Sequence, residues 1–206
     1  DRDSLAQYSL STAYDVSTAS GSIETLIIDG GVGSINGFNS GDPFGLTFND
    51  DGSKNGEEFS VLSQQYDSFE ELSTTSLSNG NYVIAFRHHS NIKFQIIKTD
   101  SEVDEFAVYN ETIEQVNSNT DSKTKPVVSP LNNGGFVISW SSYRQDGDQW
   151  GVFARTYNSE GIASSEEFQV NTTTTDRQQN SSVAGLVDGG FVISWQSHNQ
   201  DGNGDG

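Results

Sequence analysis

Aspartate and asparagine residues at the end of the sequence are spaced as calcium ligands are. The run Asp201–Gly206 reads Asp-Gly-Asn-Gly-Asp-Gly. This run matches the start of a calcium loop, in which alternate side chains converge on the ion and glycines permit the sharp turn. We therefore predict that Asp201, Asn203 and Asp205 bind calcium. The alternative is an ordinary hairpin turn, in which Gly and Asp serve the backbone rather than a metal.

Two earlier turns have a similar composition but offer fewer oxygen ligands. Gln145–Asp148 places Asp146 and Asp148 on either side of a glycine, and Asn49–Gly52 contains Asp50. Because calcium takes about six to eight oxygen ligands, backbone carbonyls would have to complete either site. We include these three aspartates among the candidate metal ligands, although Asp-Gly turns also form without a metal.

Other residues that are common in active sites lack the spacing that catalysis requires. His88 and His89 follow Arg87, but no His-Glu-x-x-His zinc motif and no Gly-x-Ser-x-Gly nucleophile elbow occurs. Carboxylates are numerous enough for a glycosidase pair. However, repeated units supply similar residues at several places, whereas catalysis needs one asymmetric site. We predict that the histidines lie in a solvated turn and that the protein is not an enzyme.

The elements that position these residues belong to a repeat. Gly134–Trp140 and Gly189–Trp195 both read Gly-Gly-Phe-Val-Ile-Ser-Trp and lie 55 residues apart, and a related copy, Gly80–Phe86, lies 54 residues earlier. A second set of positions has the same period: Val61, Val116 and Val170, followed by Asp67, Asp121 and Asp176. Two sets with one period indicate a true repeat. We predict that these aspartates make turn or capping hydrogen bonds, with a metal-binding role as the alternative.

Each repeat contains four short segments with the composition of strands. In the clearest copies we expect strands at Ser182–Leu186, Phe191–Trp195, Val152–Tyr157 and Glu167–Asn171, separated by turns rich in Gly, Asp and Asn. The run Phe-Val-Ile-Ser-Trp is apolar without strict alternation, which is typical of a strand buried on both faces. We therefore expect Trp140 and Trp195 in the core, whereas Trp150 follows a polar turn and is a candidate for an exposed, sugar-stacking position.

Four strands in about 50 residues, with an inner strand covered on both sides, are the pattern of a β-propeller blade. We predict an all-β fold, a β-propeller built from four-stranded blades. The single repeat domain spans 1–206, with approximate units at 1–60, 61–115, 116–169 and 170–206. The last unit is incomplete, and residues 1–20 are a candidate for its missing strands. A four-bladed ring and a part of a larger propeller both fit.

The composition excludes several classes of partner. A net charge of −19 argues against nucleic acid, whose phosphates require a basic surface, and against anionic membranes. No run approaches the roughly 18 apolar residues of a membrane helix, so we expect no direct membrane insertion. The aromatic content of 11% argues against disorder. The absence of cysteine rules out disulfides, and metal ions are the first candidate among the other means of holding a secreted chain together.

Several segments resemble tandem propeller-type repeats of about 54 residues in large secreted bacterial proteins, often found beside RTX-type calcium-binding repeats. The residues that carry the resemblance are Gln169–Thr173, Asp188–Ser197, Gln200–Gly202, Val152–Asn158, Tyr8–Ala19 and Gly45–Lys54. Residues 62–114 fit least well, because Arg87–His89 replaces the Gln-Asp-Gly turn. The resemblance implies a secreted or cell-surface location and a calcium-dependent, non-catalytic role in adhesion or envelope structure.

We therefore predict a calcium-binding, extracellular structural or adhesive repeat module of a bacterial surface or secreted protein. The expected partners are cell-surface or extracellular proteins or glycans, and self-assembly through an exposed strand is a further expectation. The alternative is a calcium-dependent carbohydrate-binding lectin domain with pockets near the Asp-rich turns. Because the chain begins at Asp1 rather than Met, we expect a piece of a longer protein.

Overall fold

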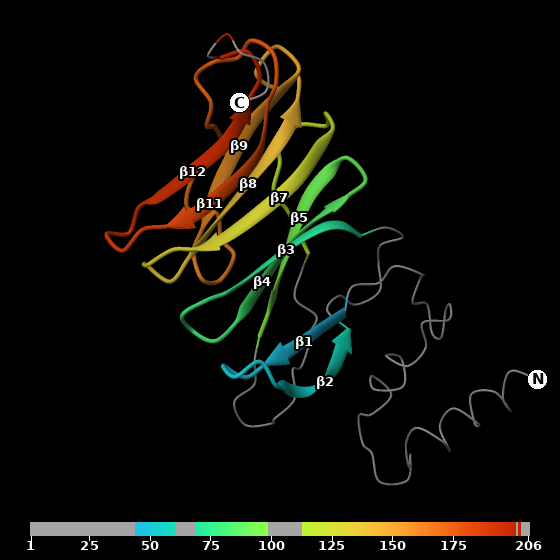
Figure 1. Ribbon diagram of the computed structural model, residues 1–206, viewed down its shortest axis with the longest axis vertical. Helices are drawn as coiled ribbons and strands as arrows, with labels where there is room; N and C mark the ends of the chain where they lie inside the picture. The colour runs from blue at the N-terminus through green and yellow to red at the C-terminus, as the bar shows by residue number, and fades with distance from the viewer. Residues whose placement is uncertain (1–43, 61–68, 99–112, 201, 203–206) are drawn as a thin grey trace, which may run out of the picture. The chain divides into compact units, whose positions relative to one another are not determined.

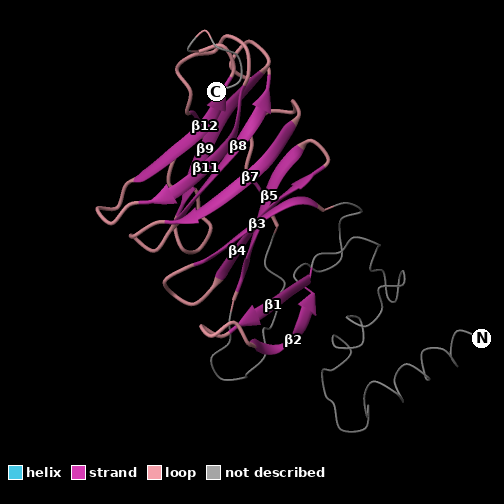
Figure 2. Cartoon of the chain, in the orientation of Figure 1, coloured by secondary structure: helices cyan, strands magenta, loops and turns pink. Residues whose placement is uncertain are grey.

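The computed structural model describes residues 44–60, 69–98, 113–200 and Gly202. The chain divides into two compact units, Asp1–Asp67 and Ser68–Gly206. Every regular element in the described ranges is a β-strand (Figure 2), and none of these residues forms a helix that would cross a membrane. The prediction of an all-β protein is confirmed.

The described part of the first unit is one hairpin. Strand β1 (Phe44–Phe48) pairs antiparallel with β2 (Lys54–Ser60). The turn between them is closed by bonds from the Gly52 N–H to the Asn49 carbonyl at 3.0 Å and from the Asn49 N–H to the Ser53 carbonyl at 2.9 Å.

The described residues of the second unit form two four-stranded antiparallel sheets and a two-stranded one, each made of strands consecutive in the chain (Figure 1). The first sheet comprises β3 (Glu70–Ser76), β4 (Tyr82–His88), β5 (Asn91–Ile97) and β6 (Glu114–Gln115). The second comprises β7 (Lys123–Pro130), β8 (Phe136–Tyr143), β9 (Trp150–Tyr157) and β10 (Phe168–Gln169). The third comprises β11 (Gln178–Gly185) and β12 (Phe191–Ser197).

The first hairpin of each of these sheets has the same turn. A glycine N–H donates to the carbonyl of the leucine three residues earlier, at 3.0, 3.0 and 3.1 Å for Gly80, Gly134 and Gly189. Their φ angles are 87°, 87° and 95°, in the left-handed region that glycine adopts at the lowest cost. The repeated glycines seen in the sequence are therefore required by a repeated turn.

The first strand of each sheet also contains a bulge at the same place. The pairing register shifts around Glu71, Lys125 and Asn180, whose φ angles are 55°, 53° and 59°. These residues connect successive sheets. The Lys125 N–H donates to Glu71 Oε2 at 2.6 Å, and the Lys125 ammonium donates to Asn180 Oδ1. A residue at the bulge of each sheet is therefore hydrogen-bonded to a residue at the bulge of the next sheet.

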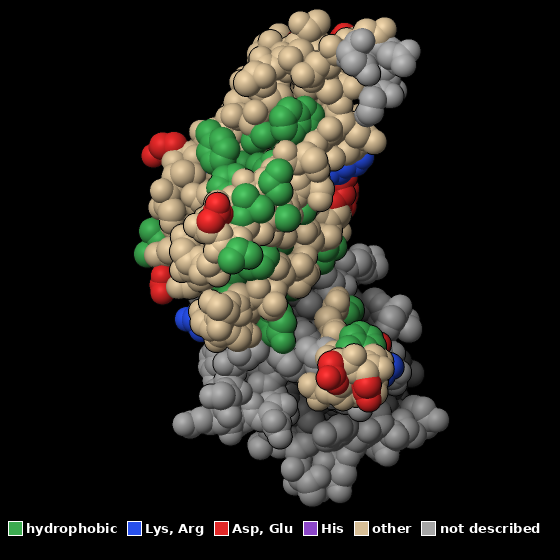
Figure 3. Space-filling model, turned by 60° about the vertical axis from the view of Figure 1, so that its left-hand side comes forward, with side chains coloured by type: hydrophobic (Ala, Val, Ile, Leu, Met, Phe, Trp, Pro, Cys, Tyr) green, Lys and Arg blue, Asp and Glu red, His purple; other side chains and the backbone are tan. Residues whose placement is uncertain are grey.

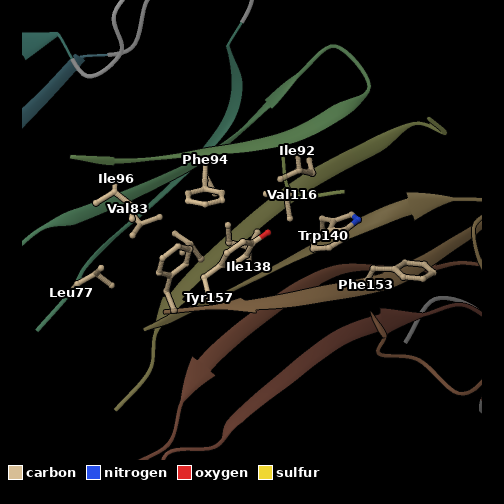
Figure 4. Packing of buried hydrophobic residues seen from close by; sticks show 13 residues of the cluster. Leu77, Val83, Ile92, Phe94, Ile96, Val116, Ile138, Trp140, Phe153 and Tyr157 are labelled. Atoms are coloured by element: carbon tan, nitrogen blue, oxygen red, sulfur yellow. The ribbon is translucent and has the colours of Figure 1, made fainter. Parts of the chain in front are cut away.

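The main core lies between the first and second sheets (Figure 4). Phe94 from β5 contacts Phe136 from β8 and Tyr157 from β9, with ring centroids 5.3 and 4.8 Å apart. Phe136 and Tyr157 are themselves stacked at 5.0 Å. Burial raises the pKa of the Tyr157 hydroxyl above its usual value. The aromatic side chains of the two sheets therefore form one shared apolar layer.

A second apolar cluster lies on the opposite face of β8 and β9. Val137 and Ala154 are fully buried there, and Val183 from β11 and Ile193 from β12 pack against them. Strand β8 is consequently buried on both faces from Phe136 to Ser142, as the sequence predicted.

Strand β12 differs from β8 although it contains the same five residues. Its side chains alternate between half-buried and exposed, and Val192 is 51% exposed. Trp195 is half-buried, whereas Trp140 has no exposed surface. The expectation of a fully buried Trp195 is therefore wrong, because no described residues cover the second face of β12.

This difference predicts unequal effects of the same substitution at equivalent positions. Trp140→Ala should lower the free energy of unfolding by about 3 to 5 kcal/mol, because it leaves a large cavity between two sheets. Trp195→Ala should cost clearly less, because its side chain already contacts solvent. Urea unfolding of both variants measures the two losses, and equal losses would contradict the burial difference.

Candidate functional site

The turn between β8 and β9 contains the best described pair of predicted calcium ligands, Asp146 and Asp148. The Gly147 N–H donates to the Arg144 carbonyl at 3.2 Å, and the Arg144 N–H donates to the Gln149 carbonyl at 2.6 Å. Both aspartate side chains are partly buried. The turn is thus closed by its own backbone, which leaves the carboxylates to interact with other parts of the chain.

Asp146 is held against the start of β9. Its Oδ2 accepts a 2.9 Å hydrogen bond from the Asn171 amide. A Cβ atom at Gly151 would lie 2.4 Å from the same oxygen, so that only glycine leaves room for this carboxylate. The position of Asp146 therefore depends on the absence of a side chain at Gly151 as well as on the hydrogen bond from Asn171.

Asp148 connects the turn to the next repeat unit. Its Oδ2 accepts a 2.8 Å hydrogen bond from the backbone N–H of Asp176. Asp176 has a φ of 64°, and its own Oδ2 accepts a 3.2 Å bond from Asn199. Two predicted ligands, Asp146 and Asp148, and the repeated aspartate Asp176 are therefore linked through a few hydrogen bonds.

Gln145 connects this turn to the segment between β9 and β10 of its own sheet. Its amide donates to Glu167 Oε1, and Glu167 Oε2 accepts a 2.8 Å bond from the Ser118 N–H. The Gln145–Asp148 turn thus contacts residues after its own sheet directly, and Ser118 before it only through Glu167.

An asparagine in each four-stranded sheet makes the same set of hydrogen bonds. Asn171 Oδ1 accepts from the Val152 N–H at 2.7 Å, and its amide donates to the Thr173 carbonyl at 2.9 Å. Asn117 Oδ1 accepts from the Ile92 N–H at 2.8 Å, and its amide donates to the Asn119 carbonyl at 2.8 Å. Both asparagines are 3% exposed. They join the last strand of each sheet to the start of its third strand.

The third partner of these asparagines differs between the two sheets. The Asn171 amide donates to the carboxylate of Asp146, whereas the Asn117 amide donates to the neutral Asn91 at 3.0 Å. The shorter β4–β5 hairpin therefore lacks the carboxylate that the β8–β9 turn places here.

A buried lysine is a second difference between the successive sheets. Lys123 has no exposed surface, and its ammonium donates to Asn119 Oδ1 and to the Asp121 carbonyl. Burial lowers the pKa of Lys123, while the charges of Asp121 and Glu167 act in the opposite direction. The equivalent residue 55 positions later is neutral.

That neutral residue is Gln178, which is also fully buried. Its amide donates to the Thr175 carbonyl at 2.8 Å, while its Oε1 has no hydrogen-bond partner. The first junction between sheets thus contains a buried lysine near Asp121 and Glu167, whereas the next has a neutral amide at the equivalent position.

The remaining predicted ligands are less well placed. Asp50 is exposed in the β1–β2 turn, where the carboxylate of its neighbour Asp51 accepts bonds from the Ser53 hydroxyl and N–H at 2.6 and 2.8 Å. These bonds lower the pKa of Asp51. Asp201, Asn203 and Asp205 lie outside the described residues.

The basic cluster belongs to a hairpin. Arg87 forms ion pairs with Glu70 and Glu71, at 3.1 Å for the latter, and donates to the His89 carbonyl at 3.0 Å. The rings of His88 and His89 lie 4.1 Å apart. These contacts shape the end of the β4–β5 hairpin.

Trp150, the predicted sugar-stacking residue, is partly covered. Its ring lies 5.2 Å from that of Tyr143, and the side chain is half-buried. The residue makes a bridge to Arg177 of the next unit. Trp150 therefore contributes to the contact between two successive sheets, and part of its side chain is exposed to solvent.

Two wider features of the described residues bear on chemistry. They contain no group of three or more His, Asp or Glu side chains arranged to hold a metal. They form a shallow polar pocket of about 240 Å³ whose lining residues are Arg177, Gln179, Gln196, Ser197 and His198. The pocket is thus lined by hydrogen-bonding groups, and the imidazole of His198 is the ring in its lining.

Comparisons with protein-family models, with curated proteins and with solved structures gave no match. The chemistry of the site therefore rests on its own residues.

The buried asparagines generate a prediction about stability. Asn171→Ala should lower the free energy of unfolding by about 1 to 3 kcal/mol, because it leaves the buried Val152 N–H without an acceptor. Asn132→Ala, at an exposed turn residue, is the control and should cost less than about 1 kcal/mol. Chemical denaturation of both variants tests this, and a loss no larger than that of the control would contradict the role of Asn171.

Lys123 generates a prediction about pH. The unfolded chain keeps the lysine proton up to about pH 10.5, whereas the folded chain releases it at a lower pH. Within this window the unfolded state binds more protons, so the stability contributed by this group rises with pH. Lys123→Gln, which copies Gln178, should abolish that rise.

The measurement is urea unfolding of both proteins at several alkaline pH values, with the exposed-lysine variant Lys98→Gln as control. The raised pKa of Tyr157 acts equally in all three proteins, so the difference between their curves isolates Lys123. Parallel curves for the parent and Lys123→Gln would show that the fold does not favour the neutral lysine.

Proposed function

We propose that the chain is a structural and adhesive repeat module of an extracellular or cell-surface protein, in which calcium at the Asp-Gly turns stiffens a stack of sheets. The proposal rests chiefly on the hydrogen bonds that side chains of the β8–β9 turn make with other parts of the chain. The side chains of Gln145, Asp146 and Asp148 are hydrogen-bonded to Glu167, Asn171 and Asp176, in the stretch that leads from their own sheet to the next. A turn that bridges units in this way affects the rigidity of the whole stack.

The two junctions between sheets support a role for a bound cation. At the first junction, Lys123 brings a positive charge among oxygen atoms. At the second, Asp146, Asp148 and Asp176 bring negative charge, Gln178 is neutral where the first junction has Lys123, and Arg177 is cationic. A divalent cation would neutralise these carboxylates, and partly exposed carboxylates together with backbone carbonyls are the ligands that calcium prefers.

The stacking of four-stranded sheets supports a β-propeller as the complete architecture. Each sheet is a simple antiparallel succession of strands, and the first strand of each contacts the next through its bulge. These are the features of propeller blades that pack face to face. In this proposal the module is either a closed four-bladed ring or a part of a larger propeller.

The lectin alternative receives less support from the geometry. The polar pocket beside β11 and β12 has no Phe, Tyr or Trp in its lining, whereas sugar-binding sites commonly stack such a ring against the sugar face. Half-buried Trp150 remains the residue on which a lectin site would be built. A glycan array probed with and without chelator tests this second candidate.

Calcium titration of the chelator-stripped protein tests the leading proposal. We expect calorimetry to show binding and the melting temperature to rise with calcium, because a ligand that binds only the folded state stabilises it. The double variant Asp146→Asn, Asp148→Asn keeps the hydrogen-bond acceptors but removes the charges. It should lose much of the calcium-dependent rise while melting almost normally in chelator.

Asp188→Asn provides the matched control. Asp188 is an exposed turn residue whose carboxylate accepts from the Gly190 N–H at 3.1 Å, and its substitution should leave the calcium effect intact. Identical melting with calcium and with chelator would refute the calcium mechanism. A rise that persists fully in the double variant would remove the Gln145–Asp148 turn from the proposal and direct attention to Asp201, Asn203 and Asp205.

A further inference from the structure

The first hairpin turns of the three sheets described in the second unit contain residue pairs with a chemistry of their own. The first two turns contain Asn79–Gly80 and Asn133–Gly134, whereas the third contains Asp188–Gly189. An asparagine before glycine is open to attack by the next backbone nitrogen, because glycine has no side chain to shield that nitrogen. Hydrolysis of the ring that forms gives aspartate. The equivalent turns therefore contain the reactant and the product of one reaction.

The three turns differ in this residue but not in its hydrogen bond. In each turn a side-chain oxygen accepts from the backbone N–H two residues later, at 3.1, 3.0 and 3.1 Å for Asn79, Asn133 and Asp188. Asparagine and aspartate both have this acceptor oxygen. The backbone bond that closes the turn is also kept. The Leu186 N–H donates to the Gly190 carbonyl at 2.7 Å, and the Leu77 N–H donates to the Asn81 carbonyl at 2.8 Å. The turn therefore accommodates aspartate without losing these bonds.

The surroundings of the second turn restrict its movement. Gly135 is buried, and a Cβ atom at this position would lie 2.2 Å from the Tyr157 carbonyl oxygen. The Asn132 amide donates to the Val187 carbonyl of the third turn at 2.6 Å. Formation of a ring at Asn133 requires the backbone on either side to rotate. Asn133 is therefore held between two anchored residues.

The first turn has more freedom to open. Asn79 and Gly80 are both exposed, and the residue equivalent to Gly135 is the half-buried Asn81. In both turns the glycine N–H donates to a leucine carbonyl at 3.0 Å, so the nitrogen is released only when the turn opens. Because this bond is the same in the two turns, the difference in packing determines which of them opens more readily.

We infer that Asn79 is a site of spontaneous deamidation, by which the first turn acquires the Asp-Gly form of the third. The Gly80 backbone nitrogen loses its proton to solvent and attacks Cγ of Asn79. The bond from Cγ to Nδ2 breaks, and the amino group takes one proton from solvent and leaves as ammonia. Water then opens the ring at Cγ, which gives aspartate with the original backbone, or at the other ring carbonyl, which gives isoaspartate. One water is consumed and one ammonia released, without an oxidant or a cofactor.

The new carboxylate enters a chain that is already acidic, with a net charge of −19. On the face of the molecule that Figure 3 shows, most Asp and Glu side chains are separated by uncharged surface. Exposed charges further apart than about 8 Å are largely screened at physiological ionic strength. We therefore expect the added charge to change retention on an anion-exchange column while the free energy of unfolding stays nearly the same.

The test follows the full chain by peptide mapping with mass spectrometry, during incubation at body temperature and mildly alkaline pH. Deamidation adds about 1 Da in ordinary water and about 3 Da in heavy-oxygen water, because the new oxygen comes from solvent. We expect Asn79 to convert at least about threefold faster than Asn133, because its turn opens more readily. Fragment ions that distinguish aspartate from isoaspartate identify the product.

Two variants separate the effect of packing from that of sequence. Asn132→Ala removes the bond to the Val187 carbonyl, so conversion of Asn133 should become faster while that of Asn79 stays the same. Asn79→Asp introduces the product directly. It should melt within about 2 °C of the parent, because the third turn makes the same bonds with aspartate.

Absence of a mass gain at Asn79 would overturn the inference, and a free peptide of residues 76–83 shows whether the sequence or the fold prevents the reaction. Conversion of Asn133 at an equal or higher rate would also overturn it, as would isoaspartate as the sole product at Asn79. None of these measurements involves calcium, so the calcium proposal stands or fails separately.

Discussion

The structure of the second unit depends on the burial of both faces of β8. A strand with apolar side chains on both faces cannot lie at a surface, so it requires a sheet on each side. The first sheet supplies Phe94 for one face, and β11 and β12 supply Val183 and Ile193 for the other. Its own four-stranded sheet alone would leave both of these faces in water, and a single neighbouring sheet would cover only one. The repeated sheets are therefore the minimum that buries this strand.

Polar side chains determine how the covered sheets fit together. The sequence has no cysteine, and disulfide cross-links are thus excluded. Asparagines buried at the ends of the sheets and carboxylates in the turns replace them, each satisfying backbone groups of a neighbouring segment. Because an unsatisfied buried donor is costly, these bonds select one arrangement among the many that apolar packing alone would permit. Several of the acidic residues therefore have a structural role.

The sequence was sufficient to predict the strands and turns but not the asymmetry between units. The repeated Phe-Val-Ile-Ser-Trp predicted a strand buried on both faces, and this is correct for β8 but not for β12. Burial depends on the neighbouring sheet, which a local pattern does not contain. Likewise, the period identified Val116 and Val170, while the adjacent asparagines and buried Lys123 gave no local signal of their role. Only the fold brings Asn171 to Asp146 and Glu167 to Gln145.

The bonds between the bulges have a consequence for how the chain acquires its structure. Those that link Glu71 to Lys125 and Lys125 to Asn180 join residues 54 and 55 positions apart. The sequence separation of the bonded residues is thus one repeat, however many repeats a chain contains. Folding that proceeds from the N-terminus during synthesis or export can then add one sheet at a time to an existing template. The length of the stack does not increase the loop that each new sheet must close.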